Sequence, residues 1–436
     1  MKKLDFNNLT TRVEQLPTNS NFGHITRVVG LIIESQGPEV SIGELCLIKH
    51  QDRTVRAEVV GFDDSKVLLM PIGDMDGITP GARVVATGER LSVKVGEELL
   101  GQVVDGLGKP IYHHNGPMPG LLDMPLKAQP PDPLSRERIT EPMALGIRSI
   151  DGLISCGRGQ RVGIFAGSGV GKSTLMGMAA RNTDADINVI GLVGERGREV
   201  LDFLERDLGQ EALEHSVVVV ATSDKPALVR VKAAHVTTAI AEYFRDQGHD
   251  VLLMMDSITR VAMALREIGL AVGEPPTTRG YPPSVYAELP KLLERTGTND
   301  RGSITALYTV LVEGDDFNEP ISDTVRGILD GHILLSRELA SRNHYPAVDV
   351  LESVSRVMHE VSSPEHLEAA GELKKLLADY REAEDLINIG AYQAGSNPAV
   401  DRAINKIELI DNFLRQDMKE KAEFAETIRR LTEIVR

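Results

Sequence analysis

The sequence predicts a multidomain chain: an N-terminal β-barrel, a central α/β P-loop domain with a parallel sheet, and an α-helical C-terminal domain. Three observations predict this order. Short β-rich runs come first, apolar runs that alternate with helical stretches follow, and only helical patterns remain at the end. With 436 residues the chain is too long for one ordinary hydrophobic core, so two or three domains are expected.

Composition and charge restrict the class of protein. The formal net charge is −16, whereas duplex DNA or RNA binders need a basic face, so we expect no nucleic acid partner. Two cysteines, Cys46 and Cys156, are too few for a disulfide framework and favour a reducing compartment. There is no apolar run near the roughly 18 residues that span a bilayer, and no apolar signal region near Met1. The sequence therefore predicts a soluble cytoplasmic protein.

Residues 1–22 form the first segment. Leu9, Val13 and Leu16 share one face of a short amphipathic helix, which Pro17 would end. A frayed terminus explains the same residues equally well. We interpret these residues as an N-terminal amphipathic or regulatory segment.

The pattern of residues 23–95 predicts the β-barrel. Gly, Asp and Pro separate a series of short β-rich runs, namely HITRVVGLIIES, GELCLIKH, TVRAEVVGF, KVLLMPI and ARVVAT. Short strands at such close intervals are typical of a small barrel or sandwich.

The pattern of residues 96–355 predicts the central α/β domain. After a Gly-rich passage, a connector at about 120–145 is kept extended by its prolines, Pro125, Pro130, Pro131, Pro133 and Pro142. Apolar runs then alternate with helical stretches, which indicates a parallel sheet covered on both faces. These runs are RVGIFA, INVIGLV, SVVVVA, VLLMMD and ITALYTVLV. From 356 to 436 the strands stop, and amphipathic patterns predict a helical C-terminal domain.

A glycine-rich loop follows the first of these apolar runs. Glycines at 167, 169 and 171 allow a sharp turn whose N–H groups cradle phosphates at the start of a helix. Lys172 can reach the β- and γ-phosphates, and the Ser173 hydroxyl suits Mg²⁺, so we predict ATP and Mg²⁺ as ligands. Ala166 stands where the pattern usually has its first glycine. The predicted nucleotide-binding residues of the loop are Ala166, Gly167, Ser168, Gly169, Val170, Gly171, Lys172, Ser173 and Thr174.

Two acidic residues follow other apolar runs of the predicted sheet. Asp256 ends VLLMMD and is suited to hold Mg²⁺ through a water; an aspartate that merely ends a strand is the alternative. Glu195 follows INVIGLV and could polarise a water for attack on the γ-phosphate, or it could be surface charge on a loop.

Longer stretches carry a family resemblance. GERGRE, DSITRVAMALREIG, GEPPTTRGYPPSVYAELPKLLERTG and PAVDVLESVS resemble the α/β-subunit family of rotary ATP synthases, and within it the export ATPases of flagella and type III secretion systems. The resemblance spans almost the whole chain. It implies a RecA-like ATPase domain over 96–355 and hydrolysis of ATP to ADP and phosphate.

The resemblance also implies roles for single residues. Glu195 sits where catalytic subunits have the general base, and Arg196 and Arg260 would help to hold the phosphates. Arg356 matches the arginine finger that reaches the nucleotide of a neighbouring subunit. Tyr345 lies where the family packs an aromatic ring against adenine, with a core tyrosine as the alternative.

The expected function is that of an ATP-hydrolysing motor of flagellar type III protein export. By resemblance, a homohexameric ring would couple hydrolysis to release and unfolding of export substrates. Its expected partners are a coiled-coil stalk protein in the pore, a regulatory protein on the N-terminal segment, chaperone–substrate complexes, and the export gate. Through that gate it would associate peripherally with the inner face of the cytoplasmic membrane.

Other readings of the sequence remain open. A virulence-type secretion ATPase would share every residue named here. A catalytic subunit of a rotary ATP synthase is more distant because the chain is short, and Glu195 argues against a non-catalytic subunit. A hexameric RNA helicase has the same core fold, but the negative charge and the lack of an aromatic and basic stripe argue against it.

Overall fold

The computed structural model describes residues 21–50, 53–112, 118–312, 316 and 319–436. The predicted helix with Leu9, Val13 and Leu16 lies outside these residues. The chain forms two compact units. Of the described residues, the first unit contains those up to Leu91 together with 270–274, and the second contains those in 92–269 and 275–436.

The first unit is a closed barrel whose strands are joined in the order β1-β2-β5-β4-β3-β6. The strands are β1 (Phe22–Val29), β2 (Ile32–Gln36), β3 (Glu44–His50), β4 (Arg53–Asp63), β5 (Lys66–Pro71) and β6 (Arg83–Arg90). Inward-facing aliphatic side chains such as Ile33, Ile48 and Val59 form its core. The run HITRVVGLIIES is a hairpin, because Gly30 adopts a φ of 56° that breaks it into two strands. The predicted barrel is confirmed.

The second unit is built on a sheet in which all five predicted apolar runs pair in parallel. These are β13 (Arg161–Ala166), β14 (Ile187–Val193), β15 (Ser216–Ala221), β16 (Asp250–Asp256) and β18 (Ser303–Leu311). Every residue of β14 and β15 is buried, which explains why these runs lack alternation. The α/β class predicted from these runs is confirmed.

Five further strands extend this sheet beyond the predicted five. They are β8 (Val103–Asp105), β9 (Pro110–Tyr112), β17 (Gly297–Thr298), β19 (Gly331–Leu335) and β20 (Val348–Ser355). On one side β19 pairs in parallel with β13, and β20 returns antiparallel to β19 as the edge strand. On the other side β8 and β9 come from the Gly-rich passage. The full order is β20-β19-β13-β18-β16-β14-β15-β8-β9.

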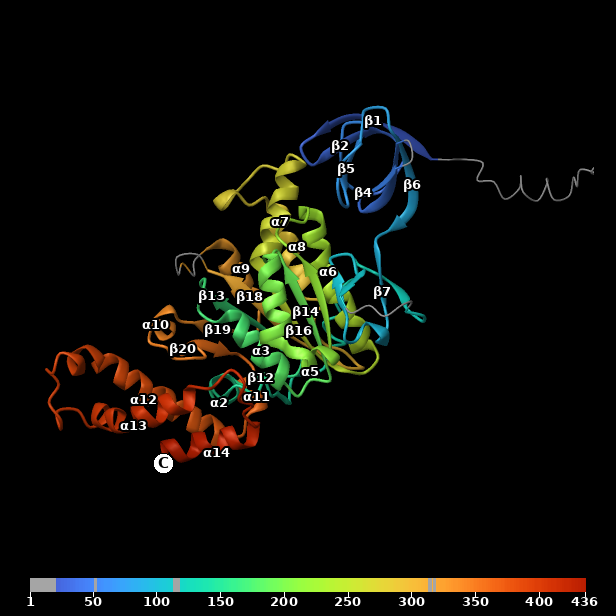
Figure 1. Cartoon of the computed structure of the whole chain (residues 1–436). Coiled ribbons are helices and arrows are strands. Elements are labelled where there is room, and N and C mark those ends of the chain that lie inside the picture. Colours follow the sequence, from blue (N-terminus) through green and yellow to red (C-terminus); the bar gives the residue numbers. More distant parts are fainter. Residues whose placement is uncertain (1–20, 51–52, 113–117, 313–315, 317–318) are drawn as a thin grey trace, which may run out of the picture. The chain divides into compact units, whose positions relative to one another are not determined.

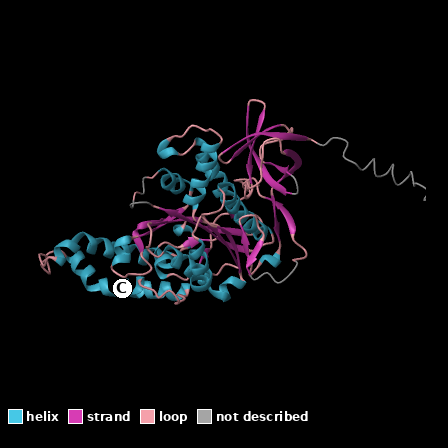
Figure 2. Ribbon diagram, turned by 45° about the horizontal axis from the view of Figure 1, so that its top comes forward, coloured by secondary structure: helices cyan, strands magenta, loops and turns pink. Residues whose placement is uncertain are grey.

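Helices lie on both faces of the sheet (Figure 2). They are α2 (Arg148–Leu153), α3 (Lys172–Asn182), α4 (Gly197–Asp202), α5 (Gly209–Glu214), α6 (Ala227–Asp246), α7 (Ile258–Ala271), α8 (Pro283–Leu293), α9 (Pro320–Ile328), α10 (Arg337–Ser341) and α11 (Met358–Val361), with short turns η1 (Glu97–Leu99) and η3 (Thr278–Gly280). A π-helical turn, η2 (Phe203–Leu208), joins α4 to α5.

The proline-rich stretch at about 120–145 has no helix. It contributes β10 (Leu122–Pro125), which pairs with β7 (Ser92–Val95), and β11 (Pro142–Met143), which pairs with β12 (Cys156–Gly157).

Three long helices follow α11 and confirm the predicted helical character of the C-terminal part (Figure 1). They are α12 (Pro364–Asn388), α13 (Pro398–Leu414) and α14 (Phe424–Val435). Ser363 and Asn397 cap α12 and α13, each of which begins with proline. All three helices pack against α2, so this part shares one core with the nucleotide domain. In the described part of the chain, no helix combines the length and apolar character that a membrane span requires.

The contact between α3 and η2 gives a test of the fold. A Cβ added to Gly177 of α3 would lie 2.4 Å from the Asp207 carbonyl oxygen. We expect Gly177→Ala to lower the free energy of unfolding by about 1–3 kcal/mol through overpacking, measured by thermal and denaturant unfolding. Gly371→Ala is the control: nothing lies within 4 Å of its added Cβ in α12, so it should gain about 0.5–1 kcal/mol. Equal effects of both changes would contradict this packing.

Candidate nucleotide site

The glycine-rich loop lies between the end of β13 at Ala166 and the start of α3 at Lys172. Gly169 and Gly171 have φ values of 77° and 94°, which side chains rarely adopt. A Cβ on Gly169 would meet nothing within 4 Å, so its backbone conformation alone requires glycine. Gly171 is the N-cap of α3, so the loop delivers the positive end of an eleven-residue helix.

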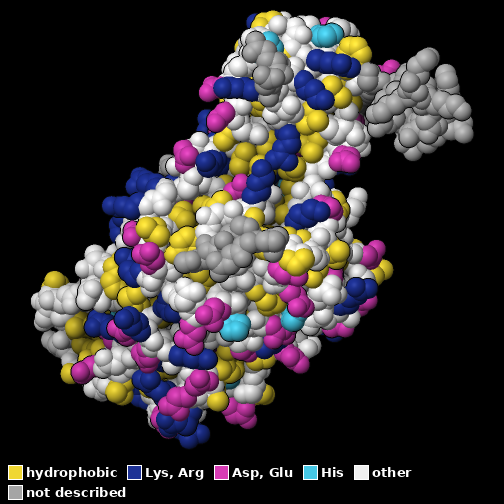
Figure 3. All heavy atoms as spheres, turned by 45° about the vertical axis from the view of Figure 1, so that its right-hand side comes forward, with side chains coloured by type: hydrophobic (Ala, Val, Ile, Leu, Met, Phe, Trp, Pro, Cys, Tyr) yellow, Lys and Arg dark blue, Asp and Glu magenta, His cyan; other side chains and the backbone are white. Residues whose placement is uncertain are grey.

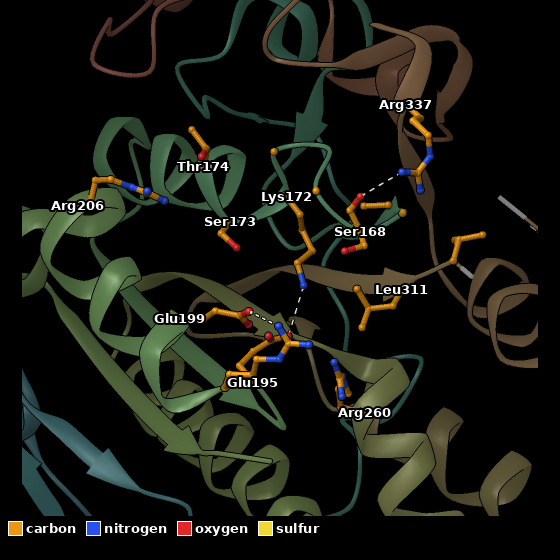
Figure 4. Close-up of a pocket in the computed structure, with 16 residues that line it drawn as sticks. Ser168, Lys172, Ser173, Thr174, Glu195, Glu199, Arg206, Arg260, Leu311 and Arg337 are labelled. Atoms are coloured by element: carbon orange, nitrogen blue, oxygen red, sulfur yellow. Dashed lines mark hydrogen bonds and ion pairs between the residues drawn. The ribbon is translucent and has the colours of Figure 1, made fainter. Parts of the chain in front are cut away.

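The loop borders a cavity of about 580 Å³ (Figure 4). Most of the predicted site residues line it, namely Ala166, Gly167, Ser168, Gly169, Gly171, Lys172, Ser173, Thr174, Glu195, Arg196 and Arg260. Val170 is buried behind the loop instead. The prediction missed Glu199, Arg206, Leu311, Val312 and Arg337, which complete the lining. Arg337, at the start of α10, reaches across to the Ser168 carbonyl oxygen at 3.4 Å.

Lys172 lies between two carboxylates. Its Nζ pairs with Asp256 Oδ1 at the end of β16 and lies 3.5 Å from Glu195 Oε1. Burial alone would lower the pKa of the Lys172 ammonium, but these two carboxylates outweigh burial and raise its pKa. Asp256 is buried too, and its Oδ1 also accepts a hydrogen bond from Thr309 at 2.7 Å. A lysine that is charged here can bind phosphate oxygens.

Glu195 has an environment suited to a base. Burial, followed by the negative charge of Asp256, raises the pKa of Glu195 to about 7. Oε1 of Glu195 accepts no hydrogen bond from a described residue. Glu199 lies beside it, one helical turn further along, and Arg196 Nη1 is 3.5 Å from Glu199 Oε1. A buried carboxylate with an unfilled acceptor site can hold a water.

Oxygen donors suited to a divalent cation gather at a small hollow of about 10 Å³. The Ser173, Glu195, Glu199 and Asp256 side chains line it. Mg²⁺ prefers such oxygen ligands and keeps several waters and phosphate oxygens of its own, so few protein ligands are required. These residues therefore fit the metal that the sequence predicts.

A second cavity of about 580 Å³ adjoins the loop through Gly169, Gly171 and Thr174. Tyr345 lines it and is 41% exposed, so its ring lies at a cavity rather than in the core. An added Cβ on Gly171 would lie 3.4 Å from the Tyr345 ring. Apolar side chains, Leu175, Met178, Pro346 and Met418, form much of the remaining wall. Such a pocket beside a phosphate loop can hold a flat, weakly polar ring.

The other wall of this second cavity is a segment that the prediction missed. Residues 415–420, here called the strap, follow α13 and line the cavity with Arg415, Gln416, Asp417 and Met418. Gln416 donates from its backbone N–H to the Tyr345 carbonyl oxygen at 3.0 Å, and its side-chain amide donates to the Gly146 carbonyl oxygen at 2.8 Å. A lone glutamine carries no recognisable pattern, so sequence reasoning had no signal for it.

Arg148, at the start of α2, binds the strap through several hydrogen bonds. This buried guanidinium donates from Nε to the Phe413 carbonyl oxygen at 2.7 Å, and also contacts the Arg415 carbonyl and the Glu420 carboxylate. The Arg148 N–H donates to Gln416 Oε1 at 2.9 Å. The strap is therefore held by charge-assisted hydrogen bonds to the nucleotide domain.

Arg356 is not near the phosphate loop of its own chain. It follows β20, whose last residue Ser355 pairs with Gly331 at the start of β19. Since β19 is parallel to β13, Arg356 lies at the amino-terminal ends of the central strands, whereas the loop lies at their carboxyl ends. The six residues of β13 separate the two ends by about 17 Å, at roughly 3.3 Å per residue. The exposed Arg356 side chain makes no hydrogen bond or ion pair with a described residue.

Known protein families match three stretches of this chain. The nucleotide-binding domain of the ATP synthase alpha/beta family matches residues 146–355, and its beta-barrel domain matches residues 25–88. The T3SS EscN ATPase C-terminal domain matches residues 362–433. A flagellum-specific ATP synthase of Bacillus subtilis is 57% identical over 97% of each chain. The chain belongs to the ATP synthase α/β family.

Further relatives place it among the export members of this family. A type 3 secretion system ATPase of Xanthomonas euvesicatoria is 52% identical over 98% of this chain and 97% of its own. The assembled ATPase EscN of the enteropathogenic E. coli type III secretion system is 51% identical, with a TM-score of 0.91 over 95% of this chain and all of its own. A second structure shows EscN in complex with its central stalk EscO, with a TM-score of 0.88, 50% identity and the same coverage. The family and the ATPase class that the sequence resembles are confirmed.

The strap can be tested through Arg148. We expect Arg148→Met to lower the free energy of unfolding by about 3 kcal/mol, because it leaves buried acceptors unpaired. It should also weaken nucleotide binding, since the strap walls the second cavity. Thermal unfolding and titration with a fluorescent nucleotide measure the two effects. Arg429→Met, on exposed α14 ion pairs, is the matched control and should change neither. Unchanged nucleotide affinity in the Arg148 variant would show that the strap does not shape the site.

Proposed function

We propose that this chain is the ATP-hydrolysing motor of a flagellar type III protein export apparatus and works as a homohexameric ring. One observation carries the hydrolytic part: Glu195, Lys172 and Asp256 meet beside the phosphate loop. The 57% identity with a flagellum-specific ATP synthase supports the flagellar assignment. Hydrolysis would drive release and unfolding of substrates from their chaperones.

Each residue at the loop has a distinct task in this reaction. The loop N–H groups and Lys172 bind the phosphates, and Arg260 and Arg196 complete the positive lining. Ser173 and Asp256 would hold Mg²⁺, which would neutralise charge that develops on the phosphates. Glu195 orients the attacking water and accepts its proton. Tyr345 packs against the adenine ring in the second cavity.

Arg356 completes the site of a neighbouring copy. In its own chain it lies at the opposite edge of the sheet, about 17 Å along β13 from the loop. A side chain that far away cannot contact the γ-phosphate, whereas a head-to-tail neighbour can present it there. Its charge would stabilise the transition state, as arginine fingers do in other ATPases and GTPases.

The comparisons support one of the proposed partners, the stalk, and the others are proposed from the family resemblance. A coiled-coil stalk would occupy the pore, as the complex of EscN with its central stalk suggests. A regulatory protein would bind the N-terminal segment, and the export gate would bring the ring to the cytoplasmic membrane. On the face shown in Figure 3, basic side chains of the second unit are interspersed with acidic ones, which favours protein partners over nucleic acid.

A virulence-type secretion ATPase is the second candidate, because relatives of that kind reach 52% identity. Deletion of the gene decides between the two. Loss of filament growth with intact effector secretion supports the flagellar role, and the reverse result supports the virulence role.

Replacement of Glu195 tests the hydrolytic proposal. We expect Glu195→Gln to bind ATP normally and to lower kcat by about 10²–10⁴-fold, because the amide cannot accept the proton. Phosphate release and nucleotide titration measure the two properties, with Glu214→Gln on exposed α5 as the control. The unaltered chain should lose kcat/KM as the pH falls below about 7, where Glu195 becomes protonated. Unchanged turnover after the Glu195→Gln replacement would remove its role as base.

Replacement of Arg356 tests action between copies. We expect Arg356→Ala to bind nucleotide with unchanged affinity and to lose about 10³-fold in kcat. Turnover of the unaltered chain should rise steeply with protein concentration as copies assemble. Mass measurement at the same concentrations follows the assembly. Arg301→Ala, an exposed arginine elsewhere, serves as the control. A fully active monomer would exclude a finger supplied by a neighbour.

A further inference from the structure

The backbone that carries Arg356 is held far more firmly than its exposed side chain. The Arg356 N–H donates to the Asp330 carbonyl oxygen at 2.9 Å. The preceding hydroxyl, Ser355 Oγ, donates to the Ser155 carbonyl oxygen at 2.8 Å. Both bonds lie at the start of the central strands, where three separate segments of the chain meet.

Gln160 joins these segments through one buried side chain. It precedes β13 and is 0% exposed. Its Nε2 donates to the Asp330 carbonyl oxygen at 3.0 Å and to Ser355 Oγ at 3.1 Å, while Oε1 accepts from the Gly157 N–H at 2.9 Å. The Asp330 carbonyl oxygen thus accepts bonds from Gln160 and from Arg356 at once. A satisfied buried amide of this kind fixes the position of every group it contacts.

An ion-pair network holds Asp330 itself. Arg161 donates from Nε to Asp330 Oδ2 at 3.0 Å and from Nη2 to Oδ1 at 3.2 Å, and its Nη1 lies 2.6 Å from Glu294 Oε1. Two-point pairing of an arginine with a carboxylate restricts orientation as well as distance. The acceptor for the Arg356 N–H is therefore itself immobilised.

Gly331 allows β19 and β20 to approach Gln160 closely. A Cβ added to Gly331 would lie 2.6 Å from the Val354 carbonyl oxygen and 3.2 Å from Gln160 Nε2. The end of β20 therefore lies directly against Gln160, with no side chain between them.

We propose that Gln160 is a positioning residue for the nucleotide site of the next copy of this chain: it holds the backbone of Arg356, so that the arginine side chain extends toward that site from a fixed position. This rests on the proposed role of Arg356 between copies. Gln160 touches no nucleotide in either copy. Its effect is to fix the backbone position from which the arginine side chain extends, so that only the side chain has still to be ordered in the transition state.

Single variants give the first measurement. Gln160→Leu should bind nucleotide as tightly as the unaltered chain and lower kcat by up to about 100-fold, the cost of misplacing a catalytic group. Ser355→Ala removes only the hydroxyl that Gln160 contacts and should lower kcat about fivefold to tenfold. It remains informative where Gln160→Leu fails to fold. Ser135→Ala, which loses a 2.8 Å bond from an exposed hydroxyl to the Asp132 carbonyl oxygen, is the matched control with unchanged turnover.

Mixed rings give the decisive measurement, because a merely structural defect would not be rescued by a neighbour. Gln160→Leu retains Lys172 and Glu195, whereas Glu195→Gln retains a correctly held Arg356. Mixed in equal amounts before assembly, they should regain turnover at about a quarter of the interfaces of a closed ring. Gln160→Leu mixed with Arg356→Ala should regain none, since neither supplies a positioned finger. The same two mixtures are made with Ser355→Ala.

The mixture of Arg356→Ala with Glu195→Gln distinguishes a failure of the role inferred for Gln160 from a failure of the role proposed for Arg356. If this mixture regains turnover but Gln160→Leu with Glu195→Gln does not, Gln160 acts within its own site and the inference is wrong. If Arg356→Ala with Glu195→Gln also stays inactive, Arg356 is not a finger between copies, and the proposed function fails at that point.

Discussion

The direction of one strand, β13, determines where every part of the site lies. The phosphate loop follows its carboxyl end at Ala166, and the parallel strands β16 and β14, which lie beyond β18 in the sheet, bring Asp256 and Glu195 to the same ends of the strands. At its other end lie Gln160 and Arg161, which hold the backbone of Arg356 through Asp330. Because β20 returns antiparallel to β19, its last residue lies at the edge that faces away from the loop.

The charges at the loop edge constrain one another. Lys172 is buried between Asp256 and Glu195, and each charge would be costly there without the others. Burial, together with the negative charge of Asp256, keeps the pKa of Glu195 raised although Lys172 lies beside it. A buried ion group of this kind contributes little to stability but is well suited to accept a cation and phosphates together. The free site therefore has one ammonium for two carboxylates. This arrangement suits a ligand that brings both a cation and phosphates.

The sequence predicted the parts of the fold that have a strong local signal. Fully buried parallel strands such as β14 and β15 appear as unbroken apolar runs, and glycines with positive φ mark the loop. The edge strands β19 and β20 were missed, since they are short or only partly buried. The strap was missed for a different reason: Arg148 and Gln416 are 268 positions apart, and no periodicity connects them. The roles assigned to Arg356 and Tyr345 came from family resemblance alone.

The role proposed for Arg356 between copies also restricts the symmetry of an active assembly. A two-fold dimer would have to bring the loop and Arg356 of both copies into one contact, although the two lie at opposite ends of the central strands. A heterologous contact joins the loop end of one copy to the Arg356 end of the next, so that each contact completes one site. In an open row of such contacts, the copy at one end has a loop without a neighbouring Arg356, and the copy at the other end has an Arg356 without a neighbouring loop. Closure into a ring by rotation makes every copy equivalent.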